Sequence, residues 1–340
     1  ASHLGSSTAS AGSAPPPAAT AIHSFQPALF TGRATSAIPI AVPPGRRGVQ
    51  PSLAVAYSSS GRNGWLGVGW SLDVGSIERS TKNGIPKYDG TDTFTFQFQG
   101  VTSELVQVPG GTYRAKDEGL FLRFENLGAS GWEVRDKSGS RYLFGGSPDS
   151  EHVTPSGTFR WCLRKVLDPH GNTLTVTYTQ DQGQGYVTQI DYTAHEIGGV
   201  QDLSPTNSVV FTLEPRSDVE TSYRSGSAAT TAKRLKEIKT YAQGALARKY
   251  VLGYATSART GRSLLASITQ IGSDGITNLP PVTFTYQDSG SPTYPSLMSN
   301  TVPPPSVAGW NVRTAGIDLG CCNWGQVHPY LGLPWGNPQV

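Results

Sequence analysis

The feature that most constrains this chain is a period-two alternation of apolar and polar residues that recurs along much of its length. Phe94, Phe96 and Phe98 share one face of such a segment, while Thr95 and Gln97 lie on the other. Successive side chains of a strand point to opposite faces, so this pattern predicts strands with one buried and one solvated face. The same alternation occurs at Leu120/Leu122/Phe124, Leu174/Val176/Tyr178, Val209/Phe211/Leu213, Tyr250/Leu252/Tyr254 and Val282/Phe284/Tyr286.

Turn-forming residues separate these alternating segments. They include Asp89-Gly90, Pro109-Gly110-Gly111, Gly145-Gly146, the run from Asp168 to Asn172, and Asp274-Gly275. The chain has 40 glycines and 25 prolines in 340 residues, and both residue types interrupt helices. We therefore predict an all-β fold in which many short antiparallel strands and hairpins form an extended curved sheet.

Residues 232–242 allow two interpretations. Leu235, Ile238 and Tyr241 are spaced by three, as in a short helix. The following Gln243-Gly244 and the alternating run after it are typical of a hairpin instead. We favour the strand, because a lone short helix needs other elements to pack against.

Two segments form a loose internal repeat. Residues 132–145 and residues 163–178 each have the order strand, polar glycine-containing turn, strand. Stacked hairpins of this kind build a long strip of sheet in which each hairpin covers the edge of its neighbour.

Composition limits the classes of partner. Only 15% of the residues are charged, against about 25% in a typical domain, and the net charge is +3. This balance gives no reason to propose nucleic acid or an anionic membrane as partner. No apolar run approaches the roughly 18 residues that a membrane span needs. Three cysteines are too few for a disulfide framework, and Cys162, in a strand-like run, is expected to be buried.

Residues 38–80 have the most specific pattern in the chain. An alternating strand stops at Pro43-Pro44-Gly45, a basic turn follows at Arg46-Arg47, and Gln50-Pro51 leads into a second strand. Gly64, Gly67 and Gly69 then surround Trp65 and Trp70. Glycine lets the backbone turn sharply or approach another segment closely, and the indole rings supply the missing bulk. We expect both tryptophans to be core plugs, that is, buried side chains that fill the space beside the glycines. The alternative is that they stack on a sugar.

This stretch resembles the opening of the SpvB-type N-terminal domain. The resemblance rests on the run IP-x-x-VPPGR-x-G-x-QPSL-x-x-x-YSS, then NG-x-LG-x-GWSL and I-x-R-S, within residues 38–80. It extends more weakly from about residue 28 to Tyr286. Such domains begin bacterial virulence proteins, the B components of insecticidal toxin complexes and related Rhs/YD-repeat toxins. The residues that carry the motif are Pro43, Pro44, Gly45, Arg46, Gln50, Pro51, Gly64, Gly67, Gly69 and Trp70.

The resemblance implies a non-catalytic structural role. The chain would be the N-terminal segment of a toxin-complex or Rhs-type virulence protein and would help to form a β-shell around a toxic C-terminal payload. Its partners would be the remainder of a larger Rhs polypeptide or companion subunits, with self-association as a further option. The location would be extracellular after secretion, and cytoplasmic before release.

The chain divides into four expected regions. Residues 1–27 are small and polar and predict a linker-like or disordered leader. Residues 28–288 are the expected β-domain, and residues 289–310 are a linker rich in proline and serine. Residues 311–340 form an atypical tail, which lacks the Asp-x-Asn-Gly-Asp-Gly pattern that usually follows in longer relatives of the family.

No catalytic, cofactor-binding or metal-binding residue is predicted. Some SpvB-type proteins carry an ADP-ribosyltransferase in a separate C-terminal domain, but this chain has no Ser-Thr-Ser run and no Glu-x-Glu pair. His195-Glu196 begins a zincin-like pattern, but position 199 is glycine. We therefore expect His152, His170 and His195 to be solvated loop residues, and Asp89, Asp92, Asp117 and Glu118 to be turn or edge-strand charges.

A second hypothesis is a secreted surface-binding module. It would bind glycans through exposed aromatic residues such as Trp132 or Trp161. A self-assembling extracellular structural protein belongs to the same class of alternatives. An enzyme is the third and least favoured hypothesis.

Overall fold

A computed structural model describes residues 26–28 and 32–286, and the expected leader, linker and tail lie almost wholly outside these residues. Every pairing between the strands of the described part of the chain is antiparallel. The three short helical turns there are η1 (Arg46–Gly48), η2 (Gly128–Ser130) and η3 (Pro148–Ser150). The described part has no helix that is both long and apolar enough to cross a membrane. The predicted all-β fold is thus confirmed.

A small barrel forms where the main sheet closes on itself. Trp161 of β15 pairs with Ile77 of β7, and Tyr142 of β13 pairs with Val166 of β15. Together with the hairpin pairings these contacts close a ring through β7, β8, β9, β10, β11, β12, β13 and β15. The strands of the ring are β7 (Ser76–Arg79), β8 (Phe94–Phe98), β9 (Val101–Gln107), β10 (Tyr113–Ala115), β11 (Arg123–Asn126), β12 (Trp132–Arg135), β13 (Arg141–Phe144) and β15 (Gly157–Leu167). The short β14 (Glu151–Thr154) pairs with β15 outside the ring.

The inside of the small barrel is strongly aromatic. Trp132, Phe124 and Phe144 have no solvent exposure, and the ring centroids of Phe96 and Phe124 lie 4.7 Å apart in an edge-on arrangement. The other members of this core are Ile77, Phe94, Phe96, Phe98, Leu105, Leu122, Val134, Trp161 and Leu163. Edge-to-face packing of so many rings fills the barrel and fixes its strand registers.

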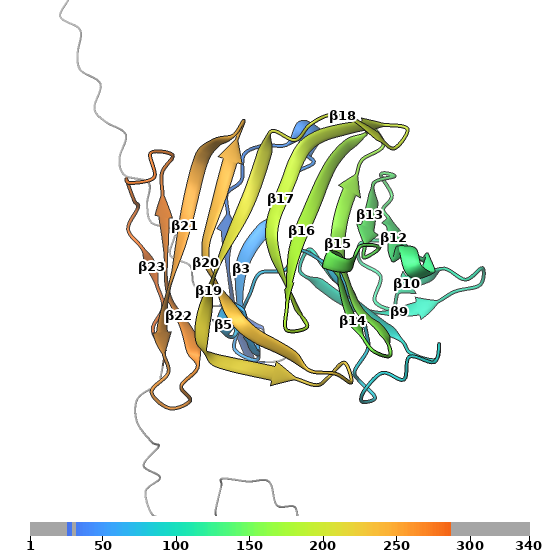
Figure 1. Ribbon diagram of the computed structural model, residues 1–340, viewed down its shortest axis with the longest axis horizontal. Helices are drawn as coiled ribbons and strands as arrows, with labels where there is room; N and C mark the ends of the chain where they lie inside the picture. The colour runs from blue at the N-terminus through green and yellow to red at the C-terminus, as the bar shows by residue number, and fades with distance from the viewer. Residues whose placement is uncertain (1–25, 29–31, 287–340) are drawn as a thin grey trace, which may run out of the picture. The chain divides into compact units, whose positions relative to one another are not determined.

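The remaining strands extend the sheet beyond β15 as long hairpins (Figure 1). They are β16 (Asn172–Asp181), β17 (Gln184–Ile197), β18 (Val200–Leu203), β19 (Asn207–Ser222), β20 (Ala229–Ala242), β21 (Ala245–Thr256), β22 (Ser263–Ile271) and β23 (Val282–Thr283). The ambiguous segment 232–242 is strand, as predicted. Gln243 and Gly244, at φ 50° and 79°, form the two-residue turn to β21.

A second, smaller sheet covers one face of these long strands. It consists of β1 (Gln26–Ala28), β2 (Arg33–Ile40), β3 (Leu53–Ser58) and β6 (Trp70–Ser71), with β4 (Asn63–Gly64) and β5 (Gly67–Val68) as a separate short pair. Figure 1 shows β3 and β5 behind the long strands. Apolar residues of both sheets form one core, which includes Ile38, Val55, Leu66, Trp70, Val176, Ile190, Phe211, Leu235 and Leu252.

Two alternating segments are not strands over their full length. Leu120 and Leu122 precede β11 in a loop, where Phe121 has a positive φ of 53° that strand geometry does not allow. At the other end, β23 stops at Thr283, so Phe284 and Tyr286 lie beyond it. Leu122 and Phe284 still reach a core, which explains why the pattern resembled a strand, whereas Leu120 is exposed.

Candidate functional site

The loop of residues 43–51 is fastened to the long sheet by its backbone. The carbonyl oxygen of Pro43 accepts a hydrogen bond from Tyr192 Oη at 2.9 Å, and that of Pro44 accepts one from Asn207 Nδ2 at 3.2 Å. Gly45 N–H donates to Gln50 Oε1 at 2.8 Å. A Cβ at Gly45 would overlap the carbonyl oxygen of Val49, so this tight turn requires glycine.

The glycine-rich segment 64–70 packs closely against the same sheet. Gly67 and Gly69 have φ of 86° and 81°. A Cβ at Gly67 would lie 2.5 Å from the carbonyl oxygen of Ser263 on the long sheet, and a Cβ at Gly69 would lie 2.6 Å from the ring of Tyr57 on the small sheet. Trp70 is buried, its Nε1 donates to Tyr286 Oη at 2.7 Å, and it is the core plug that the sequence predicted. Trp65 is partly buried against this core.

Among the ten motif residues, Pro43, Pro44, Gly67 and Trp70 make contacts that hold the small sheet on the long one. Gly64 contributes a carbonyl oxygen, and Pro51 a buried ring. Arg46 lies in η1 on the connection between β2 and β3, so the expected basic turn is a single helical turn. The assignment of these residues as a family motif stays a prediction.

A buried ion pair lies beneath the glycine-rich segment. Arg216 donates from Nη2 to Asp218 Oδ2 at 2.6 Å and from Nη1 to the Gly64 carbonyl at 2.7 Å. Asp218 also accepts from the backbone N–H and the hydroxyl of Ser263, each at 2.6 Å. Burial opposes ionisation of Asp218, but the guanidinium and the Ser263 donors outweigh it and hold the pKa well below its usual value.

A second charged cluster joins the small barrel to the long strands. Glu78 on β7 pairs with Arg160 on β15 at 2.7 Å and with Arg224, which follows β19. Burial raises the pKa of Glu78, but the two guanidinium groups outweigh this and keep it below the usual value. Burial and the charges of Arg160 and Arg224 lower the pKa of His152 to about 4, so this imidazole is neutral at physiological pH.

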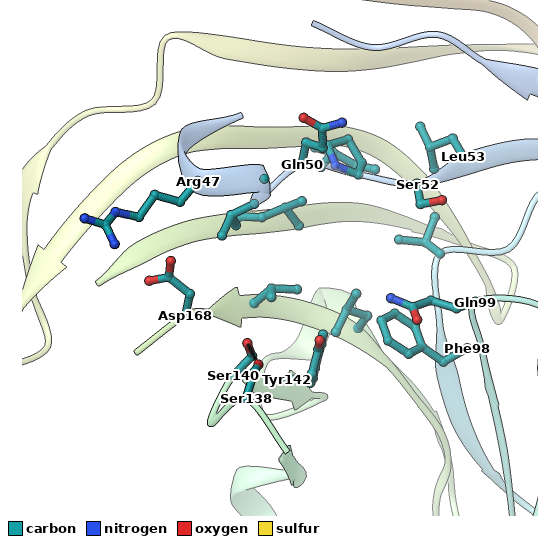
Figure 2. A pocket seen from close by; sticks show the side chains of 18 of the residues that line it. Arg47, Gln50, Ser52, Leu53, Phe98, Gln99, Ser138, Ser140, Tyr142 and Asp168 are labelled. Atoms are coloured by element: carbon teal, nitrogen blue, oxygen red, sulfur yellow. Dashed lines mark hydrogen bonds between the residues drawn. The ribbon is translucent and has the colours of Figure 1, made fainter. Parts of the chain in front are cut away.

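A pocket of about 560 Å³ lies where the two cores meet (Figure 2). The Arg47–Leu53 segment forms one side, Ser138, Ser140 and Tyr142 lie opposite, and Phe98 with Gln99 lies at one end. Arg47 and Asp168 lie at the other end. The apolar part of the lining includes Val74, Leu163, Val166, Leu174 and Ile190.

Two turns of the internal repeat form part of the pocket rim. Asp136 accepts hydrogen bonds from the N–H groups of Ser138 and Ser140, and Asp168 accepts them from His170 and Asn172, so each aspartate bonds residues i+2 and i+4. The glycines at i+3 of both turns have a φ of 85°. The repeat predicted for residues 132–145 and 163–178 is therefore present as two turns of the same geometry.

Asp73 is the exceptional acidic residue of the pocket lining. Its Oδ1 accepts a hydrogen bond from Gly75 N–H at 3.1 Å, while its buried Oδ2 has no hydrogen-bond partner. Burial raises the pKa of Asp73 to about 6, and the Gly75 N–H and the charge of Arg160 oppose this only partly. The sequence interpretation missed Asp73, because one carboxylate between two strands carries no signal of its burial.

The expectations for histidines need correction. His152 lies on β14 and is partly buried, and His195 lies on β17, so neither is a solvated loop residue. His195 bonds Asp202 through Nδ1 at 2.6 Å and the His170 carbonyl through Nε2 at 2.7 Å. The hydrogen bond to Asp202 raises the pKa of His195. His170 is the exposed loop residue that was predicted.

The carboxylates outside the pocket serve local structure. Asp89 accepts from the N–H and hydroxyl of Thr91, as a turn residue does, and Asp117 and Glu118 lie in the loop after β10. Asp92 differs from the expected surface charge, because it forms a buried ion pair with Arg79 at 2.8 Å. Within residues 26–28 and 32–286, no three histidine, cysteine or acidic side chains gather as a metal site would require.

Trp132 and Trp161 are not exposed, and this corrects the glycan-binding hypothesis built on them. Trp132 has no exposure and Trp161 is 5% exposed, since both belong to the aromatic core of the small barrel. Cys162, beside Trp161, is only partly buried by accessible area, although burial of its thiol raises the pKa to about 11. A thiol with this pKa is unreactive at neutral pH.

Comparison with known proteins identifies relatives of the chain. A model of the family described as Salmonella virulence plasmid 65kDa B protein (SpvB) matches residues 28–202. The chain is 27% identical over 200 residues to the mono(ADP-ribosyl)transferase SpvB of Salmonella choleraesuis (strain SC-B67). This alignment covers 49% of the chain and 32% of the relative, so the chain matches about a third of the length of that protein.

Solved structures share the fold. The N-terminal domain of effector protein SpvB from Salmonella typhimurium strain LT2 matches with a TM-score of 0.59 and 19% identity, over 69% of this chain and 98% of that domain. A chain of the TcdB2-TccC3 crystal structure matches with a TM-score of 0.64 and 22% identity, over 75% of this chain and 16% of that one. The curved antiparallel sheet is thus a fold that these proteins have in common.

Proposed function

The chain belongs to the family of the Salmonella virulence plasmid 65kDa B protein, and from this premise we propose that it is a non-catalytic structural segment of a bacterial toxin-complex or Rhs-type virulence protein. In this role it helps to form a β-shell that encloses or delivers a toxic C-terminal payload. Its partners are the remainder of a larger polypeptide or companion subunits, and it acts outside the cell after release.

The observation that carries the proposal is the curved sheet of long hairpins. Apart from the short β18, strands β16 to β22 are 9 to 16 residues long, and each pairs with the long strand before it. A sheet built in this way can extend into a wall without any further core. The likeness to a chain of the TcdB2-TccC3 structure, of which this fold makes up 16%, supports the view that the sheet is one part of a larger wall.

The charged groups support a non-catalytic role. Glu78, Asp92 and Asp218 are each held by arginine in ion pairs, and the pair of Glu78 with Arg160 connects two strands far apart in the sequence. The ion pairs hold the pKa of Glu78 and of Asp218 below the usual values, so these two carboxylates are poorly suited to exchange protons with a substrate.

The intact mass and oligomeric state of the native protein, isolated from its source without denaturant, test the proposal. We expect this sequence to be continuous with, or tightly bound to, a much larger Rhs-repeat polypeptide. A free chain of 36.1 kDa would overturn the shell role.

A second experiment tests for catalysis: the chain is incubated with labelled NAD and a mixture of candidate acceptor proteins. We expect no transfer of label, and turnover that persists after further purification would overturn the non-catalytic assignment.

A further inference from the structure

The pocket between the two cores has the size and lining of a ligand site. Its volume of about 560 Å³ lies within the roughly 300–1,000 Å³ of small-molecule sites. Val74 and Val166 line it and also contact both apolar cores, so the pocket lies at the junction of the small barrel and the two-sheet sandwich. The lining combines apolar side chains, which can contact the body of an organic molecule, with several polar and charged side chains that can fix its orientation.

The polar rim adds hydrogen-bonding groups at the entrance. Gln50, Gln99, Ser138 and Ser140 present amide and hydroxyl groups around the opening (Figure 2). These side chains come from three segments that are far apart in the sequence. Because the turns that carry Ser138 and Ser140 are fixed by Asp136, this part of the rim is held in place before any ligand binds.

Asp73 gives the pocket a chemical preference. A buried carboxylate oxygen without a partner costs free energy, and a hydrogen-bond donor in the pocket would recover it. The positive charge of Arg160 lowers the pKa of Asp73, but the Arg160 guanidinium forms an ion pair with Glu78 at 2.7 Å. Asp73 lines the pocket and its Oδ2 has no hydrogen-bond partner, so a ligand donor at this wall of the pocket is the partner that the site lacks.

Among the other groups near Asp73, the Gln97 side chain lowers the pKa of this carboxyl, but Asp73 Oδ2 still has no hydrogen-bond partner. Cys162 and Tyr178 act on it electrostatically, but burial raises the pKa of Cys162 to about 11 and that of Tyr178 well above its usual value. The Tyr178 hydroxyl donates instead to the Leu163 carbonyl at 2.7 Å. The other charged or titratable residues of the lining are Arg47, Tyr142, Asp168 and His170, and the Tyr142 hydroxyl donates to Asp136 at 2.9 Å.

We propose that this pocket binds an organic cation whose apolar body lies against Val74, Leu163, Val166, Leu174 and Ile190 and whose protonated amine is directed at Asp73. An ammonium group supplies both the missing donor and the opposite charge, and charge-assisted hydrogen bonds are about twice as strong as neutral ones. The site is independent of the proposed shell function.

The test uses three probes with one apolar body and different head groups. Binding of 4-phenylbutylamine, 4-phenylbutanol and 4-phenylbutanoate to the full chain is measured by calorimetric titration at pH 7.5. We expect the amine to bind at least tenfold more tightly than the alcohol, and the carboxylate to bind most weakly. Equal affinities of amine and alcohol, or no binding of any probe at millimolar concentration, would overturn the proposal.

Substitution and pH identify the group responsible. Asp73→Asn keeps the shape and removes the charge, so the amine should lose its preference over the alcohol, whereas Asp89→Asn in an exposed turn should keep it. In the unsubstituted chain, lowering the pH from 7.5 to 5 should weaken amine binding by about tenfold and leave alcohol binding unchanged, since Asp73 becomes protonated. This measurement needs no variant to fold. A pH effect of the same size in Asp73→Asn would assign it to another group, such as His170, and refute the role of Asp73.

A final probe distinguishes the source of the cation. A blocked phenylalanyl-lysine dipeptide carries the same chemistry on a polypeptide. If the dipeptide binds and 4-phenylbutylamine does not, the pocket recognises a lysine side chain of a protein, and the assignment to a small organic molecule is wrong.

Discussion

Replacement of Asp218 with alanine is expected to destabilise the chain by about 3–5 kcal/mol, the usual cost of removing one partner of a buried ion pair. The side chain of Arg216 has no exposure and that of Asp218 is 7% exposed. The variant leaves the guanidinium with the Gly64 carbonyl and Asn63 Oδ1, which are both neutral acceptors. It also removes the acceptor of the Ser263 N–H and hydroxyl groups.

Urea unfolding of the full chain, followed by tryptophan fluorescence, measures this loss. A melting temperature lower by roughly 6–20 °C is the corresponding thermal result, at about 2–4 °C per kcal/mol for a domain of this size. The double variant Arg216→Met/Asp218→Ala should be more stable than Asp218→Ala alone, because it no longer buries an unpaired charge. Asp89→Ala, which removes an exposed turn carboxylate, is the control and should have a much smaller effect.

The pH dependence provides a separate check on the same residue. The pKa of Asp218 is lower in the folded chain than its ordinary value of 3.8. Its contribution is therefore fully present above that value and is lost as the pH falls through the folded pKa. The difference between the unsubstituted chain and Asp218→Ala should be constant from pH 5 to 8 and should shrink below pH 4. A loss under about 1 kcal/mol at pH 7, or a double variant as unstable as the sum of both single variants, would refute the reasoning.

Three further predictions concern the same framework. Gly69→Ala and Gly244→Ala both place alanine at a positive φ, but only Gly69 lacks space for a Cβ. Thermal melts should show that the free energy of unfolding falls by several kcal/mol for Gly69→Ala and by about 1 kcal/mol for Gly244→Ala. Equal losses of stability would contradict the packing argument. Trp70→Phe removes a hydrogen bond to Tyr286 and part of a buried ring. Urea unfolding should show a free energy of unfolding lower by about 1–3 kcal/mol. An unchanged stability would mean that the buried indole does not stabilise the fold. Asp73 has a pKa raised from 3.8 to about 6, so its charge costs stability above pH 6, and this cost decreases as the pH falls and disappears below its ordinary pKa. Asp73→Asn should be more stable than the unsubstituted chain by up to about 3 kcal/mol at pH 8 and by about half as much at pH 5, and the absence of any difference at pH 8 would contradict the burial of this carboxylate.

Local sequence patterns were sufficient for the strands and the turns. Alternation at Phe94–Phe98 predicted β8, and the Gln243-Gly244 pair correctly decided that residues 232–242 are strand. Such patterns depend only on the alternation of side chains between the two faces of a strand, so they can be recognised from neighbouring residues. They failed at Leu120–Leu122, because apolar side chains can also reach a core from a loop whose backbone is not extended.

The candidate site was beyond local patterns. From the sequence, Trp132 and Trp161 were candidates for exposed binding residues. The pairing of β7 with β15, which are more than 80 residues apart, encloses both in the small barrel. The pocket is also made of segments separated by up to about 140 residues, and nothing in the sequence next to Asp73 indicates that its carboxylate is buried.

The sequence by itself determined the fold class, the family resemblance and the positions of the glycine-dependent turns, since each follows from residues that are close in the chain. Only the tertiary structure decided which aromatic residues are buried, which carboxylates are paired and where a cavity remains. Those properties depend on burial and on distances between strands, and both are set by long-range pairing.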